Sequence, residues 1–368
     1  MAKAKKRADG RYQQSISIGR DENGKLIRKV VYGTTRAELE QKVTELKLSL
    51  NSGKFVKNGD TMLIDYARAW LSTYKVNKGI NTQAMYENII EKHIEPSLGH
   101  YTLSEIRRSD IQQTISERSD KYRTCEQYRI TLKQILDCAV EDGIIASNPC
   151  TRIELPTKPR STKRALNDLE KQAISTAAFA DMDKAFVWLI YFFGMRREEA
   201  LAIMPADFDF KAMLLHVHKA IVFDGNTPVL SVTKNATSDR YINIPEQAVP
   251  FFKTYIANLK SMYLIHKENG ELLTQSAYTK MWRRILKCMN EAVITEAEKK
   301  MNIKPISGLT AHIFRHNYAT MLYYSGISIK KAAQLMGHAN TKMIMEIYAH
   351  LDDEKENVSE KINNVISL

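Results

Sequence analysis

The hydrophobic and polar positions of the chain change their period along the sequence, and the changes divide the chain into three parts. Near the N-terminus, "RYQQSISIG" and "LIRKVVYG" alternate polar and apolar residues around a turn signal at Asn23–Gly24, as the two strands of a hairpin do. The next segment, "TTRAELEQKVTELKLSL", repeats apolar residues at helical spacing. The pattern therefore predicts a small β-sheet with one helix over residues 1–57.

Residues 58–148 show only the helical period, and we expect a domain of four or five helices there. One of its apolar stripes, which we expect to belong to the core rather than to a ligand site, consists of Met62, Tyr66, Trp70 and Tyr74. Residues 149–164, "PCTRIELPTKPRSTKR", contain three prolines, which prevent a continuous helix, and five basic residues. We interpret this segment as a linker whose charge suits a phosphate backbone, with candidate contacts at Arg152, Lys158, Arg160, Lys163 and Arg164.

The third part, residues 165–368, mixes the two periods. A helix begins after Asn167, and the apolar run "AFVWLIYFF" predicts a buried helix that is too short to cross a bilayer. Strand-like pieces follow, "LLHVHK", "PVLSVT" and "RYINIP", with a turn at Asp224–Gly225, and the helical period then returns. The predicted fold class is multidomain and mainly α with small β-sheets, ending in a mixed α/β domain.

The net charge of the chain indicates which class of partner it binds. Lys and Arg exceed Asp and Glu by 54 − 42 = 12, and the pI is about 9.3, which favours a polyanionic partner without proving one. The start, "MAKAKKRADG", lacks the apolar segment of a signal peptide. No C-x-x-C pair occurs, so we expect free thiols in a reducing cytosol at Cys125, Cys138, Cys150 and Cys288.

The segment "HIFRHNYAT" carries the densest candidate chemistry. His312 and His316 lie four residues apart on one helical face, as in H-E-x-x-H zinc sites. However, Ile313 replaces the glutamate of that motif, and Arg315 would place a cation beside the metal. We therefore predict no metal site. His312 and Arg315 also share a face, and an imidazole beside a guanidinium suits a phosphate.

Two further segments contain matching groups. In "FFGMRREEALAI", Arg196 opens a helix whose exposed backbone N–H groups favour an anion, and Glu199 can hold an arginine in place. In "LMGHANTKMIMEIYAHL", the dipeptide Gly337–His338 precedes Tyr348 on a short helix. Each segment taken alone is a weak signal.

Together, these segments resemble the tyrosine recombinases, the phage integrase family. The order G-x-R-x-x-E, H-x-x-R-H, L-x-G-H and then a tyrosine ten residues on reads here as "GMRREE", "HIFRH", "LMGH" and "IYAH". The motifs cover residues 165–368. Residues 1–164 are similar to the family only in layout, which implies an arm-type DNA-binding domain over 1–57 and a core-binding domain over 58–148.

The resemblance implies a role for each matching residue. Tyr348 would attack a DNA phosphodiester as the nucleophile, while Arg196 and Arg315 would hold the non-bridging oxygens. His312 would assist proton transfer, and His338 would donate a hydrogen bond to the phosphate. A lysine would protonate the leaving 5′-oxygen, with Lys234 the better candidate and Lys219 the second. Structural support is expected from Glu199, Gly337 and His316.

The same chemistry can be argued without the family. A phenol has a pKa near 10, and nearby arginines and a histidine would lower the pKa of Tyr348 by favouring the phenolate. Covalent attack keeps the energy of the phosphodiester, and the arginines stabilise the charge. We therefore expect no cofactor, neither ATP nor a metal ion.

The implied function is integration and excision of a mobile element, such as a phage or conjugative transposon, in the bacterial cytosol. Double-stranded DNA with core-type and arm-type sites would be the partner, and strands would be exchanged in a homotetramer through a Holliday junction. We expect the amphipathic tail around Val358, Ile362 and Val365 to dock on a neighbouring subunit, and accessory DNA-bending factors to assist.

Three other functions fit parts of the sequence. A type IB topoisomerase would use the same covalent chemistry without partner sites. A metal-dependent transposase would need three carboxylates, and those near Asp207 and Asp209 have no accompanying pattern. A regulator that only binds DNA would not need Tyr348.

Overall fold

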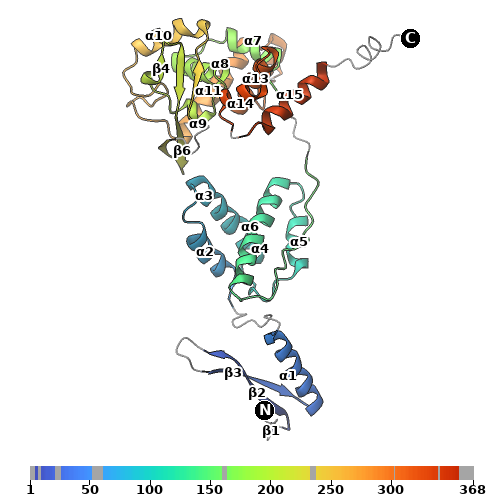
Figure 1. Cartoon of the computed structure of the whole chain (residues 1–368). Coiled ribbons are helices and arrows are strands. Elements are labelled where there is room, and N and C mark those ends of the chain that lie inside the picture. Colours follow the sequence, from blue (N-terminus) through green and yellow to red (C-terminus); the bar gives the residue numbers. More distant parts are fainter. Residues whose placement is uncertain are drawn as a thin grey trace, which may run out of the picture. The chain divides into compact units, whose positions relative to one another are not determined.

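The computed structural model describes residues 5–6, 10–20, 26–51, 61–159, 164–232, 238–301, 303–338 and 340–355. The chain groups into two compact units, residues 1–160 and residues 161–368 (Figure 1). The division falls inside the segment predicted as a linker. The separation of residues 1–57 from residues 58–148 as domains of different function stays a prediction.

The N-terminal part contains the predicted sheet and helix. Three antiparallel strands lie in the order β1–β2–β3: β1 (Lys5–Lys6), β2 (Tyr12–Arg20) and β3 (Leu26–Gly33). The helix α1 (Arg36–Asn51) follows, and its residues Leu39 and Val43 form a small core with Ile16 of β2. Alternation along β2 thus turns Ile16 toward the helix.

The helical part of the first unit contains α2 (Leu63–Tyr74), α3 (Ile80–Ile89), the π-helical turn η1 (Ile90–Ile94), α4 (Glu95–Leu98), α5 (Arg108–Ser116) and α6 (Tyr122–Glu141). Trp70 is buried, as its stripe predicts, but Tyr74 is 50 % exposed. The prediction of Tyr74 as a core residue is wrong because Leu63 and Ala67, with Trp70, form the buried face of α2.

The residues of the predicted linker differ in burial and in hydrogen bonding. Ile153 is buried and belongs to the core of the helical part. Arg152 and Lys158 are exposed, so both are free to meet a phosphate backbone. Arg164 instead binds both oxygens of buried Glu170, at 2.6 and 2.7 Å, which makes it a poor candidate for DNA contact. Arg160 and Lys163 lie outside the described residues.

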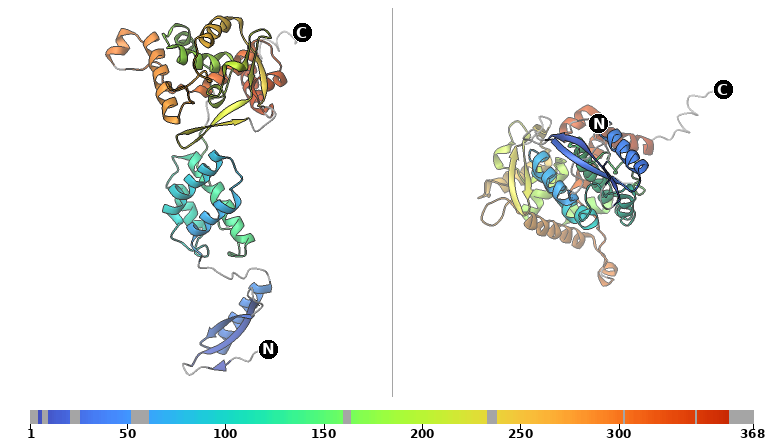
Figure 2. Two further views of the ribbon diagram at one scale, coloured as in Figure 1. Left: turned by 90° about the vertical axis from the view of Figure 1, so that its left-hand side faces the viewer. Right: turned by 90° about the horizontal axis from the view of Figure 1, so that it is seen from below.

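The second unit contains a three-stranded antiparallel sheet in the order β4–β5–β8 and a separate two-stranded hairpin, β6–β7. Its strands are β4 (Phe208–Asp209), β5 (Leu214–Val217), β6 (Lys219–Asp224), β7 (Thr227–Val232) and β8 (Arg240–Asn243). Figure 2 shows the β6–β7 hairpin projecting from the rest of this unit. The predicted turn at Asp224–Gly225 is confirmed as the end of this hairpin.

The helices of the second unit are α7 (Asp168–Thr176), α8 (Asp181–Phe192), α9 (Arg197–Ala200), α10 (Val249–Ala257), α11 (Gln275–Val293), α12 (Glu296–Lys300), α13 (Ala311–Tyr324), α14 (Ile329–Met336) and α15 (Lys342–Lys355). Two 3₁₀ turns are η2 (Pro205–Asp207) and η3 (Glu246–Ala248). Asn167 caps α7 by accepting from the N–H of Glu170 at 2.8 Å, as its position predicts.

The second unit has two apolar cores, and they meet at α13. The larger core contains the apolar run of α8, with Phe186 and Ile190 fully buried, together with Phe314 of α13. The smaller core joins α13 to α14 and α15, which lie side by side in Figure 1. One helix therefore supplies side chains to both cores. Among the described residues, no helix combines the length and apolarity that crossing a membrane requires, and all four cysteines are free thiols.

Candidate active site

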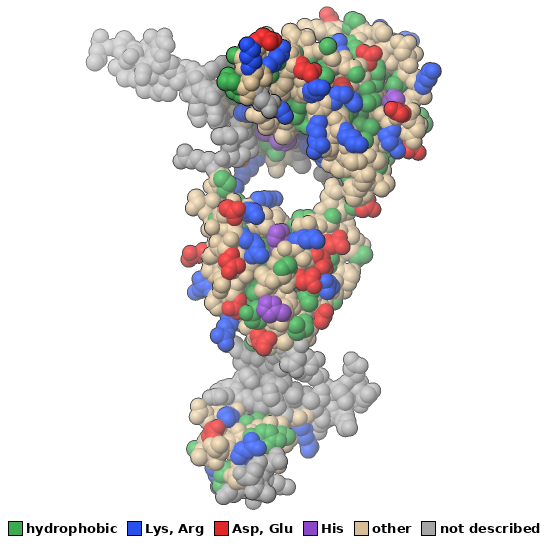
Figure 3. Space-filling model, turned by 180° about the vertical axis from the view of Figure 1, so that it is seen from behind, with side chains coloured by type: hydrophobic (Ala, Val, Ile, Leu, Met, Phe, Trp, Pro, Cys, Tyr) green, Lys and Arg blue, Asp and Glu red, His purple; other side chains and the backbone are tan. Residues whose placement is uncertain are grey.

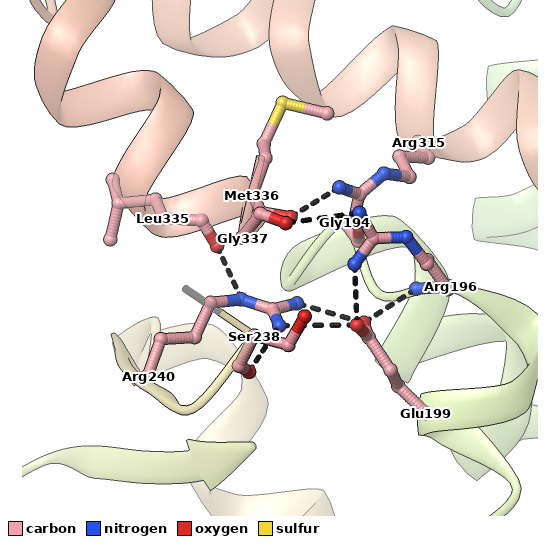
Figure 4. Close-up of polar contacts among 9 residues, drawn as sticks. All are labelled: Gly194, Arg196, Glu199, Ser238, Arg240, Arg315, Leu335, Met336 and Gly337. Atoms are coloured by element: carbon pink, nitrogen blue, oxygen red, sulfur yellow. Dashed lines mark hydrogen bonds and ion pairs between the residues drawn. The ribbon is translucent and has the colours of Figure 1, made fainter. Parts of the chain in front are cut away.

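Three of the sequence segments singled out above converge around two arginines (Figure 4). Arg196 precedes α9 as its N-cap, Arg315 lies in α13, and Gly337 ends α14 with φ +62°. The left-handed conformation of Gly337 turns the chain at this point and leaves its carbonyl free of the helix. That carbonyl accepts a hydrogen bond from Nη2 of Arg196 at 3.0 Å.

Glu199 holds Arg196 from the other side. Its Oε1 accepts from Nη1 of Arg196 at 2.7 Å, and its Oε2 accepts from the backbone N–H of Arg196 at 2.9 Å. Glu199 is buried, whereas the Arg196 side chain stays 38 % exposed. The guanidinium is therefore fixed in direction while one side remains open to a ligand.

Arg315 is buried and bound entirely by backbone oxygens. Its Nη1 donates to the carbonyl of Gly194 at 2.8 Å, and its Nη2 donates to the carbonyl of Met336. In the described part of the chain, no carboxylate forms an ion pair with this arginine. Burial, together with Arg196 and Arg240, lowers the pKa of Arg315 to about 9, so the group remains charged at neutral pH.

Gly194 is required where it lies, for two reasons. Its φ is +58°, and a Cβ at this position would overlap the ring of Tyr318. We expect Gly194→Ala to destabilise the fold by about 2–4 kcal/mol, because backbone strain and overpacking add. The matched control is Gly326→Ala, where φ is +71° and a Cβ meets open space, so only about 1–2 kcal/mol of backbone strain is expected. Denaturant unfolding measures both changes, and equal losses would contradict the close contact.

The electrostatics of the site favour an anion. Burial alone would raise the pKa of Glu199, but Arg240, Arg315 and Arg196 outweigh burial and lower it to about 2. Glu199 is thus ionised, and with these arginines the cluster carries +3 − 1 = +2. A buried excess of positive charge is costly unless an anion is present, so the site is arranged to bind one.

His338 follows the helix end that holds both arginines. Its half-buried ring and the nearby Arg315 and Arg196 lower its pKa to about 4, so it is neutral at pH 7. Its Nδ1 is buried and has no hydrogen-bond partner among the described residues. A bound anion would offset the arginine charges and favour protonation of this ring.

Acid is therefore expected to destabilise the protein partly through His338. Its pKa of about 4 in the folded state lies below the ordinary value of 6.5, so the unfolded chain binds the extra proton in this window. Stability is lost as the pH falls from 6.5 to 4. We expect the unfolding temperature to drop between pH 7 and pH 5 by about 2 °C less in His338→Asn than in the wild type. Equal drops would contradict the environment described here.

A pocket of about 480 Å³ opens beside the arginines. Arg196, His312 and Arg315 all line it, together with Tyr278 and Trp282 of α11. His312 is exposed, and its ring meets His316 edge-to-face at 4.6 Å. His316 itself is buried, which suits the supporting role predicted for it. The pocket thus brings together three of the predicted functional side chains.

Tyr348 does not face this pocket in the described conformation. Its hydroxyl donates to the carbonyl of Ile327 at 3.1 Å, and its ring lies 5.0 Å from that of Tyr323 in the smaller core. Burial raises the pKa of Tyr348, and no contact in the described part of the chain joins it to the arginines or to His338. The expected lowering of this pKa is therefore wrong for this conformation.

The structure describes only one of the two lysines that were predicted as proton donors. Lys234 lies outside the described residues. Lys219 is largely buried and donates to Asp207 at 3.0 Å, so its charge is already paired. Asp207 also accepts from the N–H of Met204, and Asp209 accepts from two N–H groups of the following turn. These carboxylates therefore stabilise turns, and among the described residues no group of three or more potential ligands could hold a metal ion.

The sequence interpretation missed one member of the cluster, Arg240. This residue is buried at the start of β8 and binds both oxygens of Glu199, at 3.2 and 2.8 Å. Exposure alternates along β8, with Arg240 and Ile242 facing inward. A charged residue at an inward position of a predicted strand was the available signal.

Comparison with known proteins decides the family. The sequence profile of the phage integrase family matches residues 162–355, and that of the phage integrase N-terminal SAM-like domain matches residues 63–118. The chain belongs to the phage integrase family. The predicted resemblance is confirmed, and with it the enzyme class: members are tyrosine recombinases, which exchange DNA strands.

The relatives of this chain include a tyrosine recombinase and two integrases. A "tyrosine recombinase XerC-like" protein of Caldanaerobacter subterraneus subsp. tengcongensis is 28 % identical over 96 % of each chain. The ICEBs1 integrase of Bacillus subtilis is 22 % identical over 98 % of this chain and 99 % of its own. The integrase of mycobacterium phage L5 is 23 % identical over 82 % and 79 %.

Solved structures show the same fold. The Tn1549 transposon integrase in complex with a circular intermediate DNA aligns with a TM-score of 0.66 at 19 % identity, covering 80 % of this chain and 99 % of the other. A lambda integrase tetramer bound to a Holliday junction aligns with a TM-score of 0.60 at 17 % identity, covering 94 % of each chain. The predicted fold class, mainly α with small β-sheets in several domains, is confirmed.

Proposed function

We propose that this recombinase integrates and excises a mobile genetic element by cutting DNA through a covalent phosphotyrosine. The observation that carries the proposal is the pair of fixed guanidinium groups, Arg196 and Arg315, which line one pocket in a cluster of net charge +2. Two such groups can each bind a non-bridging oxygen and stabilise the charge that builds at phosphorus during displacement.

The proposed step is a transesterification. The Tyr348 oxygen forms a bond to phosphorus, the bond from phosphorus to the 5′-oxygen breaks, and a 3′-phosphotyrosine results. Lys234 gives a proton to the leaving oxygen, His312 assists removal of the tyrosine proton, and His338 donates to the phosphate. The 5′-hydroxyl of a partner strand then reverses the step, so the number of phosphodiester bonds is conserved and no ATP is consumed.

Tyr348 has to leave the carbonyl of Ile327 before this step. Its hydroxyl hydrogen bond is a single neutral one, which contributes only about 0.5–1.5 kcal/mol. Movement of α15 toward bound DNA would exchange that bond for the arginine environment, where the phenolate is favoured. The raised pKa in the described conformation then protects the nucleophile when no DNA is bound.

The remaining parts of the chain serve DNA binding and assembly in this proposal. Residues 1–57 bind arm-type sites, and residues 58–148 bind core-type sites together with the second unit. Lys and Arg side chains gather on the face of the second unit seen in Figure 3, which suits a DNA backbone. Four subunits exchange strands through a Holliday junction, and the tail around Ile362, outside the described residues, docks in trans. The protein acts in the bacterial cytosol, with DNA-bending accessory factors.

The experiment that tests the function uses DNA from the ends of the element that encodes the protein. Duplexes nicked near the candidate crossover release the short 5′-hydroxyl fragment after cleavage and so trap the covalent complex. We expect a protein–DNA species that survives denaturation and forms equally in EDTA, and joined ends when two sites are supplied. Relaxation of supercoils without joined ends would instead indicate a topoisomerase.

A further inference from the structure

Arg240 is a buried charge that the proposed chemistry does not use. It is 7 % exposed, and four hydrogen bonds occupy its guanidinium. Nη1 and Nη2 donate to Glu199 at 3.2 and 2.8 Å, Nε donates to the carbonyl of Leu335 at 2.8 Å, and Nη1 also donates to the carbonyl of Ser238 at 3.1 Å. Four of its five N–H groups are thus engaged within the protein, and a single N–H of Nη2 remains, so Arg240 acts mainly on other residues of the protein.

The bonds of Arg240 reach the supports of both phosphate-binding arginines (Figure 4). Glu199 orients Arg196 through two hydrogen bonds. Leu335 precedes Met336, the last residue of α14, and its C-cap Gly337, whose carbonyls accept from Arg315 and Arg196. Arg240 therefore connects β8 to both supports, although it lies far from each of them in the sequence.

The charges give this connection a specific consequence. A lone Glu199 beside Arg196 would form a closed ion pair and neutralise the arginine that has to attract the phosphate. With Arg240 present, both oxygens of Glu199 are already bound by a second cation. Glu199 can then direct Arg196 without cancelling its charge, and the described cluster keeps a net charge of +2 rather than +1.

We propose that Arg240 is a positioning residue that compensates the charge of Glu199, so that Arg196 stays electropositive toward the scissile phosphate. This inference rests on the proposed function. It differs from a purely structural cross-link in the expected effect of a second substitution on the cleavage rate. Removing both Arg240 and Glu199 restores the net charge to +2, so the second substitution should increase the rate. A cross-link, once lost, cannot be repaired by removing its other half.

The test is a double-mutant cycle in the full-length protein with four members: wild type, Arg240→Met, Glu199→Gln and the double variant. The first-order rate of covalent complex formation is measured at saturating nicked DNA, so that affinity does not enter. We expect Arg240→Met to be slower by about 100-fold, the size of the effect when one electrostatic contribution to a transition state is lost. The double variant is expected to be about tenfold faster than Arg240→Met.

A second substrate separates charge from packing. When one non-bridging oxygen of the scissile phosphate is replaced by methyl, the substrate loses its charge. The defect of Arg240→Met should then shrink to less than about tenfold, because the missing positive charge no longer has a partner. A structural defect would slow both substrates equally.

Arg240→Lys guards against loss of folding in Arg240→Met, because it keeps the charge but loses the planar fork. Arg240→Lys should form the covalent complex within about tenfold of the wild-type rate. Thermal unfolding of both variants is measured alongside, and we expect their difference in rate to exceed what their difference in stability explains. A double variant no faster than Arg240→Met, or an Arg240→Lys as slow as Arg240→Met, would overturn the role of Arg240. Absence of any covalent complex in the wild type would instead contradict the proposed function.

Discussion

Tyr348→Phe is expected to form no covalent complex with nicked DNA, while it binds the same DNA as tightly as the wild type. The change removes only the hydroxyl, which is the proposed nucleophile, and leaves both arginines in place. The cleavage rate should fall by at least about 10⁴-fold, to background, since no other oxygen is positioned to replace it. Covalent-complex gels and electrophoretic mobility shifts on one DNA preparation measure the two properties separately.

The folding of this variant provides its internal control. Tyr348 contributes its ring to the smaller core, and the phenylalanine ring can occupy the same space. Only the hydrogen bond to Ile327 is lost, so the free energy of unfolding should fall by about 1 kcal/mol or less. Residual covalent attachment in Tyr348→Phe would show that another residue is the nucleophile.

Arg315→Lys is expected to have the second-largest effect, a reduction of cleavage by about 10²–10³-fold at saturating DNA. Lysine keeps the charge, but one ammonium group cannot bridge the carbonyls of Gly194 and Met336 and also present a fork to a phosphate. A first-order rate from single-turnover cleavage measures this loss. Arg164→Lys is the matched control, because that arginine binds Glu170 away from the cluster and should keep the wild-type rate.

A small effect of Arg315→Lys would mean that charge alone suffices at this position. The buried guanidinium would then be a structural cross-link between α13 and the end of α14. The comparison with Arg164→Lys tests whether replacing any hydrogen-bonded arginine by lysine slows cleavage. A loss of rate in Arg315→Lys alone can then be assigned to the way that the two carbonyls hold its guanidinium.

Much of the fold follows from local sequence patterns. The strand alternation of the first sheet, the cap at Asn167 and the hairpin turn at Asp224–Gly225 each depend on residues close together in the chain, whereas the turn predicted at Asn23–Gly24 lies outside the described residues. Tyr74 shows where this reasoning fails. A stripe continues to the last residue of a helix, but the tertiary partner needed to cover that residue cannot be read from periodicity.

The candidate site divides in the same way. Arg196, Glu199, Arg315 and Gly337 carry motif spacing, and the structure gathers them around one cluster. Arg240 joins through pairing of β8 with the central sheet, a long-range contact without a motif. The position of the Tyr348 hydroxyl was also not predictable, because it depends on the packing of α15 against α13 and α14, which involves no motif.

The central claim is that an oxygen of Tyr348 becomes bonded to phosphorus held by Arg196 and Arg315. The most direct measurement is mass spectrometry of the peptides recovered from the trapped complex after protease and nuclease digestion. The account predicts a nucleotide attached through its 3′-phosphate to the tyrosine of "IYAH" in the wild type, and none in Arg196→Ala or Arg315→Ala. Attachment at another residue, through a 5′-phosphate, or undiminished in those arginine variants would contradict it.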